Sequence, residues 1–303
     1  MKALIIRPGA MGDTLMVIPS LIELSGKAAV TFVGRQPGLD FIRDFVNRGL
    51  DMEAAGWHRL FMKTPDDQGL PVSQTDLVIA FFSNEDVTIR ENLKAYFPHV
   101  PIHVFPSFLP EGKGLHMARY FAECLKSAGL PVDPDRSVKK ALAGALFGDA
   151  GRSIARDRII FHPGSGDPNK NYPPDFWLKL LERSGRETTL QGLKETVLLG
   201  PAEEHLVSFF RENHLTIQSE ISFCADKETL TALLREAALY FGHDSGITHL
   251  AAMSGTPTIA LFRGSDVNQW RPLGPRVKVI DSKEAGSELV GRILEESKAL
   301  ITE

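Results

Sequence analysis

Two glycine-containing turns in the second half of the chain carry the side chains best suited to binding an anion. The first turn contains Ser165, Gly166 and Lys170, and the second places Ser245 and Gly246 before small residues with helical spacing. A helix start presents free backbone N–H groups, and glycine lets a phosphate approach closely. The two turns therefore predict a phosphate-binding site. The alternative is structural, because serine and aspartate are also good helix caps.

A carboxylate stands on a third glycine turn, near the start of the chain. Residues 8–13 read PGAMGD and follow a short apolar run. This turn lacks the third glycine of a dinucleotide-binding loop at the required spacing. Asp13 at its end would repel a phosphate, so we expect the turn not to hold a pyrophosphate.

These turns need a framework of strands to position them. Apolar runs followed by turns and by helical spacing predict strand–turn–helix units from the first residues onward. In the first half of the chain we expect helices at 14–24, 39–47 and 116–128, and strands at 2–7, 29–33, 60–62 (an edge strand), 76–82 and 102–105.

The second half repeats this alternation. Asp226 is expected to cap one of its helices. The expected helices are 175–181, 202–212, 227–237, 247–254 and 288–300, and the expected strands are 158–161, 196–199, 216–218, 238–241, 258–262 and 277–280. Parallel strands joined by helical crossovers place the turns at the carboxyl edge of the sheet, where open α/β sheets bind ligands.

The two series indicate an α/β protein with two Rossmann-like domains, residues 1–150 and 151–303. Proline and glycine punctuate residues 131–157, where the boundary is expected. The terminal helix is the element that could pack back on the first domain. We expect two such domains, joined by a linker, to face a central cleft, and clefts between domains are common substrate sites.

Composition excludes several classes of protein. The 303 residues carry a net charge of −4, which argues against broad nucleic-acid binding. Cys124 and Cys224 lie far apart, predict neither a disulfide framework nor a metal site, and fit a reducing compartment. Since the sequence shows no signal peptide and no apolar run of about 18 residues, we expect a cytoplasmic protein.

Three stretches stand out together: IIRPGAMGD at 5–13, HPGSG at 162–166 with Lys170, and GHDSGITHLA at 242–251. In this order they resemble the signature regions of glycosyltransferase family 9, the heptosyltransferases of lipopolysaccharide core assembly. The resemblance implies the GT-B fold, with the acceptor on the first domain and the nucleotide sugar on the second. It also implies inverting transfer of a heptose or related sugar from an ADP-sugar donor, without a cofactor or an obligatory metal.

Inverting transfer needs a base for the acceptor hydroxyl and positive or dipolar groups for the leaving diphosphate. The resemblance assigns the base to Asp13 and the leaving-group cation to Lys170. The structural alternatives are a cap on the helix expected near Thr14 for Asp13 and a solvated side chain for Lys170. Ser165 and Gly166 would offer hydroxyl and backbone donors to the same diphosphate.

Four further residues, Asp244, Ser245, Gly246 and His249, match the donor-binding region of the family. A carboxylate is unfavourable beside a phosphate, so Asp244 is expected to hold a sugar hydroxyl or to orient its turn. His249 shares a helix face with Ser245 and either contacts the donor or fixes the helix to the sheet. Glu203 is expected to accept ribose hydroxyls, although acidic residues are favoured at helix N-termini anyway.

The acceptor-binding candidates in the first domain are Arg35, His116 and Arg119. His116 and Arg119 resemble a family position, and an arginine there could bind an acceptor phosphate. A solvated helix face is the alternative. The expected acceptor is lipid-linked or an oligosaccharide, which leaves open a peripheral contact with the inner face of the cytoplasmic membrane.

Three segments depart from the family pattern. Residues 263–266 read RGSD where GPTD is usual, and His243 replaces a common asparagine. Asn171 and Tyr172 follow Lys170 where a basic or aromatic pair is usual. These departures bear on the sugar and the acceptor more than on the reaction class.

Two other functions stay open at this point. A catalytically silent nucleotide-sugar-binding protein could keep the fold, although binding alone does not need a carboxylate at Asp13. A nucleotide-sugar epimerase of the same architecture would need extra acid–base groups around the sugar, for which His243 and Asp244 are candidates.

Overall fold

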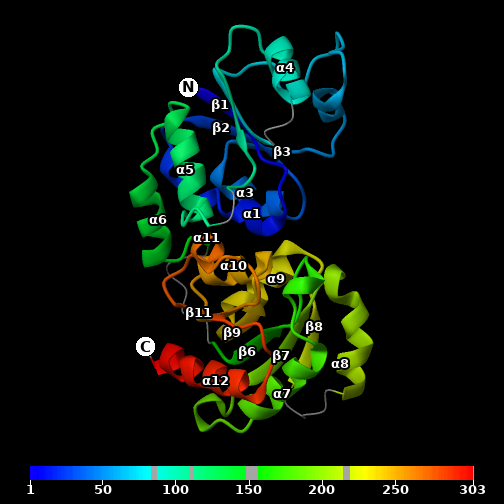
Figure 1. The fold of residues 1–303 in the computed structure, drawn as a ribbon, viewed down its shortest axis with the longest axis vertical. Helices are drawn as coiled ribbons and strands as arrows, with labels where there is room; N and C mark the ends of the chain where they lie inside the picture. Colours follow the sequence, from blue (N-terminus) through cyan, green and yellow to red (C-terminus); the bar gives the residue numbers. More distant parts are fainter. Residues whose placement is uncertain (83–86, 110–111, 148–155, 214–218, 303) are drawn as a thin grey trace. The chain divides into compact units, whose positions relative to one another are not determined.

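A computed structural model describes residues 1–82, 87–109, 112–147, 156–213 and 219–302 (Figure 1). The chain divides into two compact units, Met1–Lys140 and Ala141–Glu303. Each unit contains one parallel sheet with helical connections, which confirms the predicted α/β fold with two Rossmann-like domains. The boundary expected between residues 150 and 151 lies outside the described residues.

The sheet of the first unit has five parallel strands in the order β3-β2-β1-β4-β5. They are β1 (Lys2–Ile6), β2 (Ala29–Gly34), β3 (Arg48–Asp51), β4 (Leu77–Phe82) and β5 (Ile102–Pro106). The central strand β1 is buried from Ala3 to Ile6, as expected for an apolar run covered on both faces. Since the strand order reverses between β1 and β4, the turn after β1 lies at a topological switch point, the usual ligand position in such sheets.

Helices connect these strands, and the elements of this unit differ from the sequence prediction in several places. The connecting helices are α1 (Met11–Leu15), α2 (Ile18–Leu24), α3 (Gly38–Ile42), α4 (Val87–Tyr96), α5 (Met117–Ser127) and α6 (Pro134–Ala143). The helix expected at 14–24 begins earlier and divides into α1 and α2, with Pro19 in the first turn of the second helix, where proline is tolerated. The edge strand expected at 60–62 is wrong. A 3₁₀ helix, Trp57–Phe61, buries Trp57 and Leu60, and the edge strand is β3.

The sheet of the second unit has six parallel strands in the order β11-β10-β9-β6-β7-β8. They are β6 (Arg158–His162), β7 (Lys194–Leu199), β8 (Ser219–Phe223), β9 (Ala237–His243), β10 (Thr258–Phe262) and β11 (Val277–Asp281). The strand expected at 216–218 lies outside the described residues. The chain runs outward from β6 through β7 to β8 and then returns to β9, so the switch point lies between β6 and β9.

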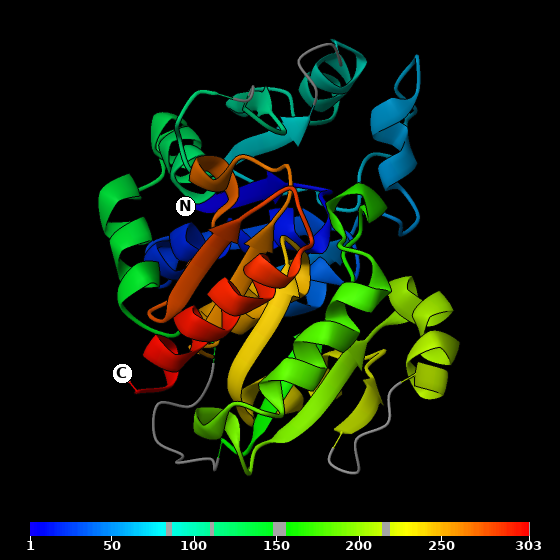
Figure 2. The ribbon, with the colours of Figure 1, turned by 60° about the horizontal axis from the view of Figure 1, so that its bottom comes forward.

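Helices cover both faces of this second sheet. They are α7 (Pro174–Ser184), α8 (Val207–Asn213), α9 (Lys227–Arg235), α10 (Gly246–Met253), α11 (Val267–Trp270) and α12 (Ser287–Thr302). The helix expected at 202–212 consists of a 3₁₀ turn, Pro201–Leu206, followed by α8. The terminal helix α12 contacts α7 and the strands β9, β10 and β11, and it lies beside α7 on one face (Figure 2).

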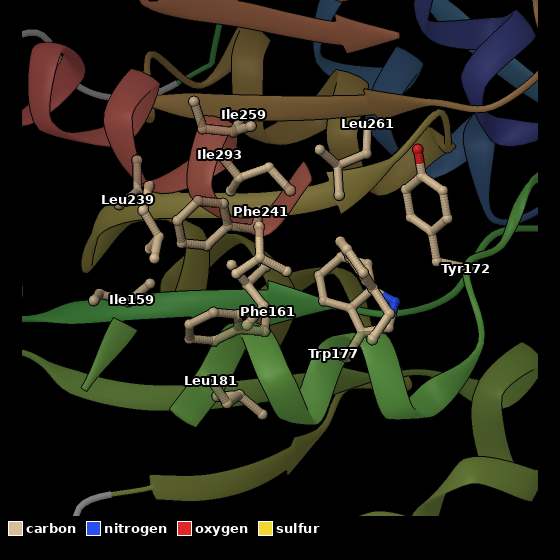
Figure 3. Close-up of a cluster of buried hydrophobic side chains, with 14 of the residues drawn as sticks. Ile159, Phe161, Tyr172, Trp177, Leu181, Leu239, Phe241, Ile259, Leu261 and Ile293 are labelled. Carbon is tan, nitrogen blue, oxygen red and sulfur yellow. The ribbon is translucent and has the colours of Figure 1, made fainter. Parts of the chain in front are cut away.

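The core of the second unit lies between the sheet and these two helices. Figure 3 shows Phe161 of β6 and Phe241 of β9 beside Trp177 of α7 and Ile293 of α12. The rings of Phe161 and Phe241 stack with centroids 5.2 Å apart. This packing holds the carboxyl ends of β6 and β9 side by side, which fixes the starting points of the two turns that follow them.

Candidate active site

The turns after β6 and β9 meet at the switch point of the second sheet. Lys170 from the first turn and Asp244 from the second form an ion pair, with 2.7 Å between Nζ and Oδ2. His249 of α10 places Nε2 3.5 Å from the other carboxylate oxygen. The structure therefore brings together three of the predicted site residues from two segments of the chain.

The Asp244 carboxylate is the centre of this cluster. Its side chain is 5% exposed, while that of Lys170 is 35% exposed. Burial alone would raise the pKa of Asp244, but the hydrogen bonds and charges of His249 and Lys170 outweigh that effect and hold the pKa well below its usual range. Asp244 is thus a stable anion that orients a lysine and a histidine.

Ser245 caps helix α10, as its residue type allows. Its Oγ accepts a hydrogen bond from the backbone N–H of Thr248 at 3.3 Å, and Gly246 is the first helical residue. The Thr248 hydroxyl donates to the carbonyl oxygen of His243 at 2.5 Å. These bonds join the start of α10 to the end of β9 and fix the direction of the helix N-terminus.

The turn after β6 is held by its own side chains. The Ser165 Oγ lies 2.6 Å from the Asn171 Oδ1 and 2.8 Å from the Asp167 carbonyl oxygen, both of which can accept its single proton. Asp167 caps the short 3₁₀ helix that ends at Lys170. A Cβ added to Gly166 would meet no heavy atom within 4 Å, so the backbone there borders open space.

The three departures from the family pattern contact one another. The Tyr172 backbone N–H donates to His243 Nε2 at 2.8 Å. Arg263 Nη1 donates to the Asn171 carbonyl oxygen at 2.9 Å, and the Arg263 guanidinium lies 5.9 Å from the centre of the Tyr172 ring. We call these residues, His243, Tyr172, Asn171 and Arg263, the loop clamp, because they tie the turn carrying Lys170 to β9 and β10.

His243 acts in the clamp as a neutral ring. Burial lowers the pKa of His243 to about 3, and neighbouring His162 adds to this effect. Because Nε2 accepts the Tyr172 N–H, the single proton of the neutral ring belongs on Nδ1. The ring also packs edge-on against Trp177, with centroids 4.9 Å apart.

Glu203 lies beneath the turn after β6. Its side chain is 4% exposed, and Oε2 accepts the Gly200 backbone N–H at 3.0 Å. A Cβ at Gly164 would collide with this side chain, so the turn can pass over Glu203 only with glycine at that position. Burial alone would raise the pKa of Glu203, but His162, 3.8 Å away, and the Gly200 N–H outweigh it and lower the pKa.

Asp13 belongs to the first unit and lies at the switch point of its sheet. It is the third residue of α1, so the helix begins before Asp13 and not near Thr14 as expected. Its Oδ2 accepts the Ala10 backbone N–H at 3.1 Å and lies 3.7 Å from Nη2 of Arg7. The bond from the Ala10 N–H closes the first turn of the helix. The Asp13 side chain is 19% exposed, so it still reaches solvent.

The three acceptor candidates have partners within the first unit. Arg35 pairs with Glu53 at 2.7 Å, and both side chains are more than half exposed. His116 caps α5 by accepting the Ala118 N–H at Nδ1, at 3.2 Å. Arg119 pairs with Glu123 and Asp135. The exposed ion pairs of Arg35 and Arg119 fit a solvated surface, and the cap formed by His116 was not foreseen from the sequence.

Comparison with known proteins places the chain in a family. The sequence of residues 110–296 matches glycosyltransferase family 9 (heptosyltransferase). The chain belongs to glycosyltransferase family 9. It is therefore a heptosyltransferase-like glycosyltransferase, as the three signature stretches predict. The comparison with curated protein sequences finds no match.

Solved structures of the family share the fold. Heptosyltransferase II of E. coli, an ADP-heptose lps heptosyltransferase, is 17% identical, with 100% of this chain and 99% of that chain covered and a TM-score of 0.72. The family 9 glycosyltransferase of Veillonella parvula is 15% identical, with 99% and 97% covered and a TM-score of 0.71. The E. coli heptosyltransferase WaaC with ADP is 16% identical, with 98% and 100% covered and a TM-score of 0.65.

Two further findings on the described residues concern membranes and metals. No helix among them combines the length and the apolar character needed to cross a membrane. Within the same part of the chain, no group of three or more His, Cys, Asp or Glu side chains is placed to hold a metal ion.

The sequence prediction did not single out two charged residues near these sites. Arg7 follows an apolar strand, and a charged residue directly after a buried run is the sequence feature that could have indicated it. Arg263 was noted only as a departure from the family pattern, because its contacts with Asn171 and Tyr172 span about 90 residues and no local pattern reveals them.

Proposed function

We propose that this glycosyltransferase moves a heptose, or a related sugar, from an ADP-sugar to a lipopolysaccharide-core-type acceptor with inversion at the anomeric carbon. The observation that carries the proposal is the pairing of Lys170 with Asp244 at the switch point of the second sheet, beside the N-terminus of α10. Family membership supports the reaction class, and the similarity to WaaC with ADP supports the nucleotide.

The donor half of the proposal uses the second unit. The diphosphate lies against Lys170, the Ser165–Gly166 turn and the backbone N–H groups at Ser245 and Gly246. A lysine ammonium has three donor hydrogens, so Lys170 can contact a phosphate while it still contacts Asp244.

The sugar and the ribose take the remaining donor-site residues. At the sugar side of the diphosphate, Asp244 accepts hydrogen bonds from sugar hydroxyls, and His249 accepts or donates one. Glu203 is assigned to the ribose hydroxyls. It must expose its carboxylate to do so, because the side chain is 4% exposed here.

The acceptor half uses the first unit, with Asp13 as the general base. An acceptor hydroxyl oxygen attacks the anomeric carbon as its proton passes to the Asp13 carboxylate. The bond between that carbon and the diphosphate oxygen breaks, and the electron pair leaves with ADP. Lys170 stabilises the negative charge that develops on the leaving group.

The proposed division of labour follows the two Rossmann-like domains. Residues 1–150 bind the acceptor and residues 151–303 bind the donor. Arg35, His116 and Arg119 are the acceptor-binding candidates, and each must exchange its present partner for the acceptor. We propose a lipid-linked or oligosaccharide acceptor met in the cytoplasm, at the inner face of the cytoplasmic membrane.

A donor panel tests this function. The purified chain is incubated with ADP-heptose, ADP-hexose or UDP-hexose, with and without lipopolysaccharide-core acceptors, and the released nucleotide and the anomer of the product are measured. We expect acceptor-dependent release of ADP and an inverted glycoside. Nucleotide binding without turnover would indicate the silent protein, and isomerised donor without acceptor would indicate the epimerase.

A further inference from the structure

Arg7 is a buried cation that the catalytic proposal does not use. It follows β1, and its backbone N–H donates to the Val33 carbonyl oxygen at 2.8 Å. The side chain is 2% exposed, and Nε and Nη2 have no hydrogen-bond partner in the described part of the chain. The guanidinium lies 5.0 Å from the ring centre of Phe108 and 5.3 Å from that of Phe121.

Such a position is unfavourable for folding alone. Removing a guanidinium from water costs several kcal/mol, and contacts with aromatic faces offset only about 0.5–2 kcal/mol each. An apolar side chain would fill the same space between two phenylalanine rings without that cost. A role in packing therefore does not explain why this position carries a charge.

The surrounding backbone is arranged for a close approach between Arg7 and Asp13. A Cβ at Gly9 would lie 2.6 Å from Arg7 Nη1 and 2.9 Å from Asp13 Cβ, so any larger residue would separate the two side chains. Nη2 lies 3.7 Å from Asp13 Oδ2, a distance that gives charge attraction without a direct hydrogen bond.

We propose that Arg7 is a positioning residue for Asp13: its fixed positive charge keeps the carboxylate ionised and oriented until the acceptor proton arrives. This inference rests on the proposed role of Asp13 as the general base. Both the Ala10 N–H and Arg7 act on Oδ2, so together they fix one oxygen and hence the plane of the carboxylate. An arginine suits this task because it stays protonated throughout the reaction and cannot take the proton itself.

The positive charge of Arg7 has two opposing effects on the Asp13 carboxylate. A neighbouring cation favours the ionised form of a carboxylate, so the base stays ready at lower pH. The same cation weakens the carboxylate as a proton acceptor. Arg7 therefore extends the working pH range downward, at some cost in the basicity of the carboxylate.

The effect of the Arg7–Asp13 pair on the pH profile can be distinguished from the titration of other groups nearby. On α5, burial raises the pKa of Tyr120 far above neutrality and raises the pKa of Cys124 to about 12, so neither titrates in an acidic window. On α3, Asp40 is engaged by Gln36 and Arg43. His116 caps α5, and it is present in every variant compared below.

The test is the pH dependence of kcat/KM for transfer in Arg7→Met and Arg7→Lys. The acid limb of the Arg7→Met profile should move to higher pH by about one unit or more, the usual effect of an opposite charge within about 4–6 Å. The loss relative to wild type is then roughly tenfold greater at the acid end than at pH 8. Arg7→Lys keeps the charge, so its limb should stay close to that of wild type.

Arg43→Met is the matched control. It removes a positive charge from the same unit at a side chain that is 49% exposed and pairs with Asp40. Its acid limb should coincide with that of wild type, because exposed charges are screened. Melting temperatures of all variants separate misfolding from the kinetic effect, and if Arg7→Met does not fold, Arg7→Gln replaces it.

Two outcomes would overturn the role of Arg7. One is a neutral Arg7 variant with an unmoved acid limb, including one whose rate falls equally at every pH, as a purely structural role would produce. The other is a limb that moves as far in Arg7→Lys as in Arg7→Met. The general-base proposal fails separately, if Asp13→Asn transfers sugar at close to the wild-type rate.

Discussion

The backbone N–H of Tyr172 donates a 2.8 Å hydrogen bond to Nε2 of His243. This bond joins the end of the turn that carries Lys170 to the end of β9, where Asp244 begins the second turn. The two residues of the Lys170–Asp244 pair are thus held by a second link a few residues away. A turn fixed before its ligand arrives loses less conformational entropy on binding.

Replacing His243 should weaken both folding and nucleotide binding. His243→Leu fills a similar space but leaves the buried Tyr172 N–H without its acceptor, which should lower the free energy of unfolding by about 1–3 kcal/mol. ADP affinity should fall as well, because the Lys170 turn loses its anchor. Urea denaturation and calorimetry measure the two effects. His205→Leu, at an exposed histidine of the same unit, is the control. If the two variants have the same free energy of unfolding and the same ADP affinity, the loop clamp does not have this role.

His243 also predicts how stability depends on pH. Its folded pKa of about 3 lies below the unfolded value of about 6.5, so the unfolded state binds the additional proton between these values. The contribution of His243 to the free energy of unfolding is fully present above about pH 6.5. It declines as the pH falls towards 3, by at most about 1.4 kcal/mol per pH unit. Denaturation at pH 7, 6 and 5 should show a smaller decline in His243→Leu than in wild type or His205→Leu.

Lys170 should contribute to ADP binding in spite of its pairing with Asp244. Lys170→Ala removes a charge-assisted contact with the diphosphate and should weaken ADP binding about tenfold or more. Lys179→Ala removes a lysine from the exposed face of α7 and should leave the affinity unchanged. Calorimetry of both variants gives the comparison. If Lys170→Ala binds ADP as tightly as wild type does, the donor site lies elsewhere.

The sequence predicted the elements that are defined by apolar runs. The buried strands β1, β4, β6, β9 and β10 were found because each is an apolar run that ends at a turn. The edge strand β3 was missed because it is held mainly by backbone pairing with β2, and RGLD carries no apolar run. The 3₁₀ helix Trp57–Phe61 was mistaken for a strand because periodicity does not distinguish short apolar segments.

The donor site could be predicted as two turns that meet, but its side-chain contacts could not. The residue types and the family resemblance brought Lys170 and Asp244 into one site, but not their 2.7 Å contact. The loop clamp and the Arg7–Asp13 contact depend on side chains that meet only after folding. In the case of Arg7, the decisive feature is burial of a charge, which no local sequence pattern gives.

Asp13→Asn separates catalysis from structure at the proposed base. Asparagine keeps the shape of the side chain and can still accept the Ala10 N–H, so α1 should form normally. It cannot take a proton from the acceptor hydroxyl, and positioned general bases contribute roughly 10²–10⁴-fold, so transfer should fall by that factor. ADP affinity should not change, because the proposed donor residues belong to the second unit. Loss of the anion beside buried Arg7 should lower the free energy of unfolding by about 1–3 kcal/mol. Transfer rate, ADP affinity and urea denaturation are measured on one preparation, and a variant that transfers sugar within a few-fold of wild type would exclude Asp13 as the base.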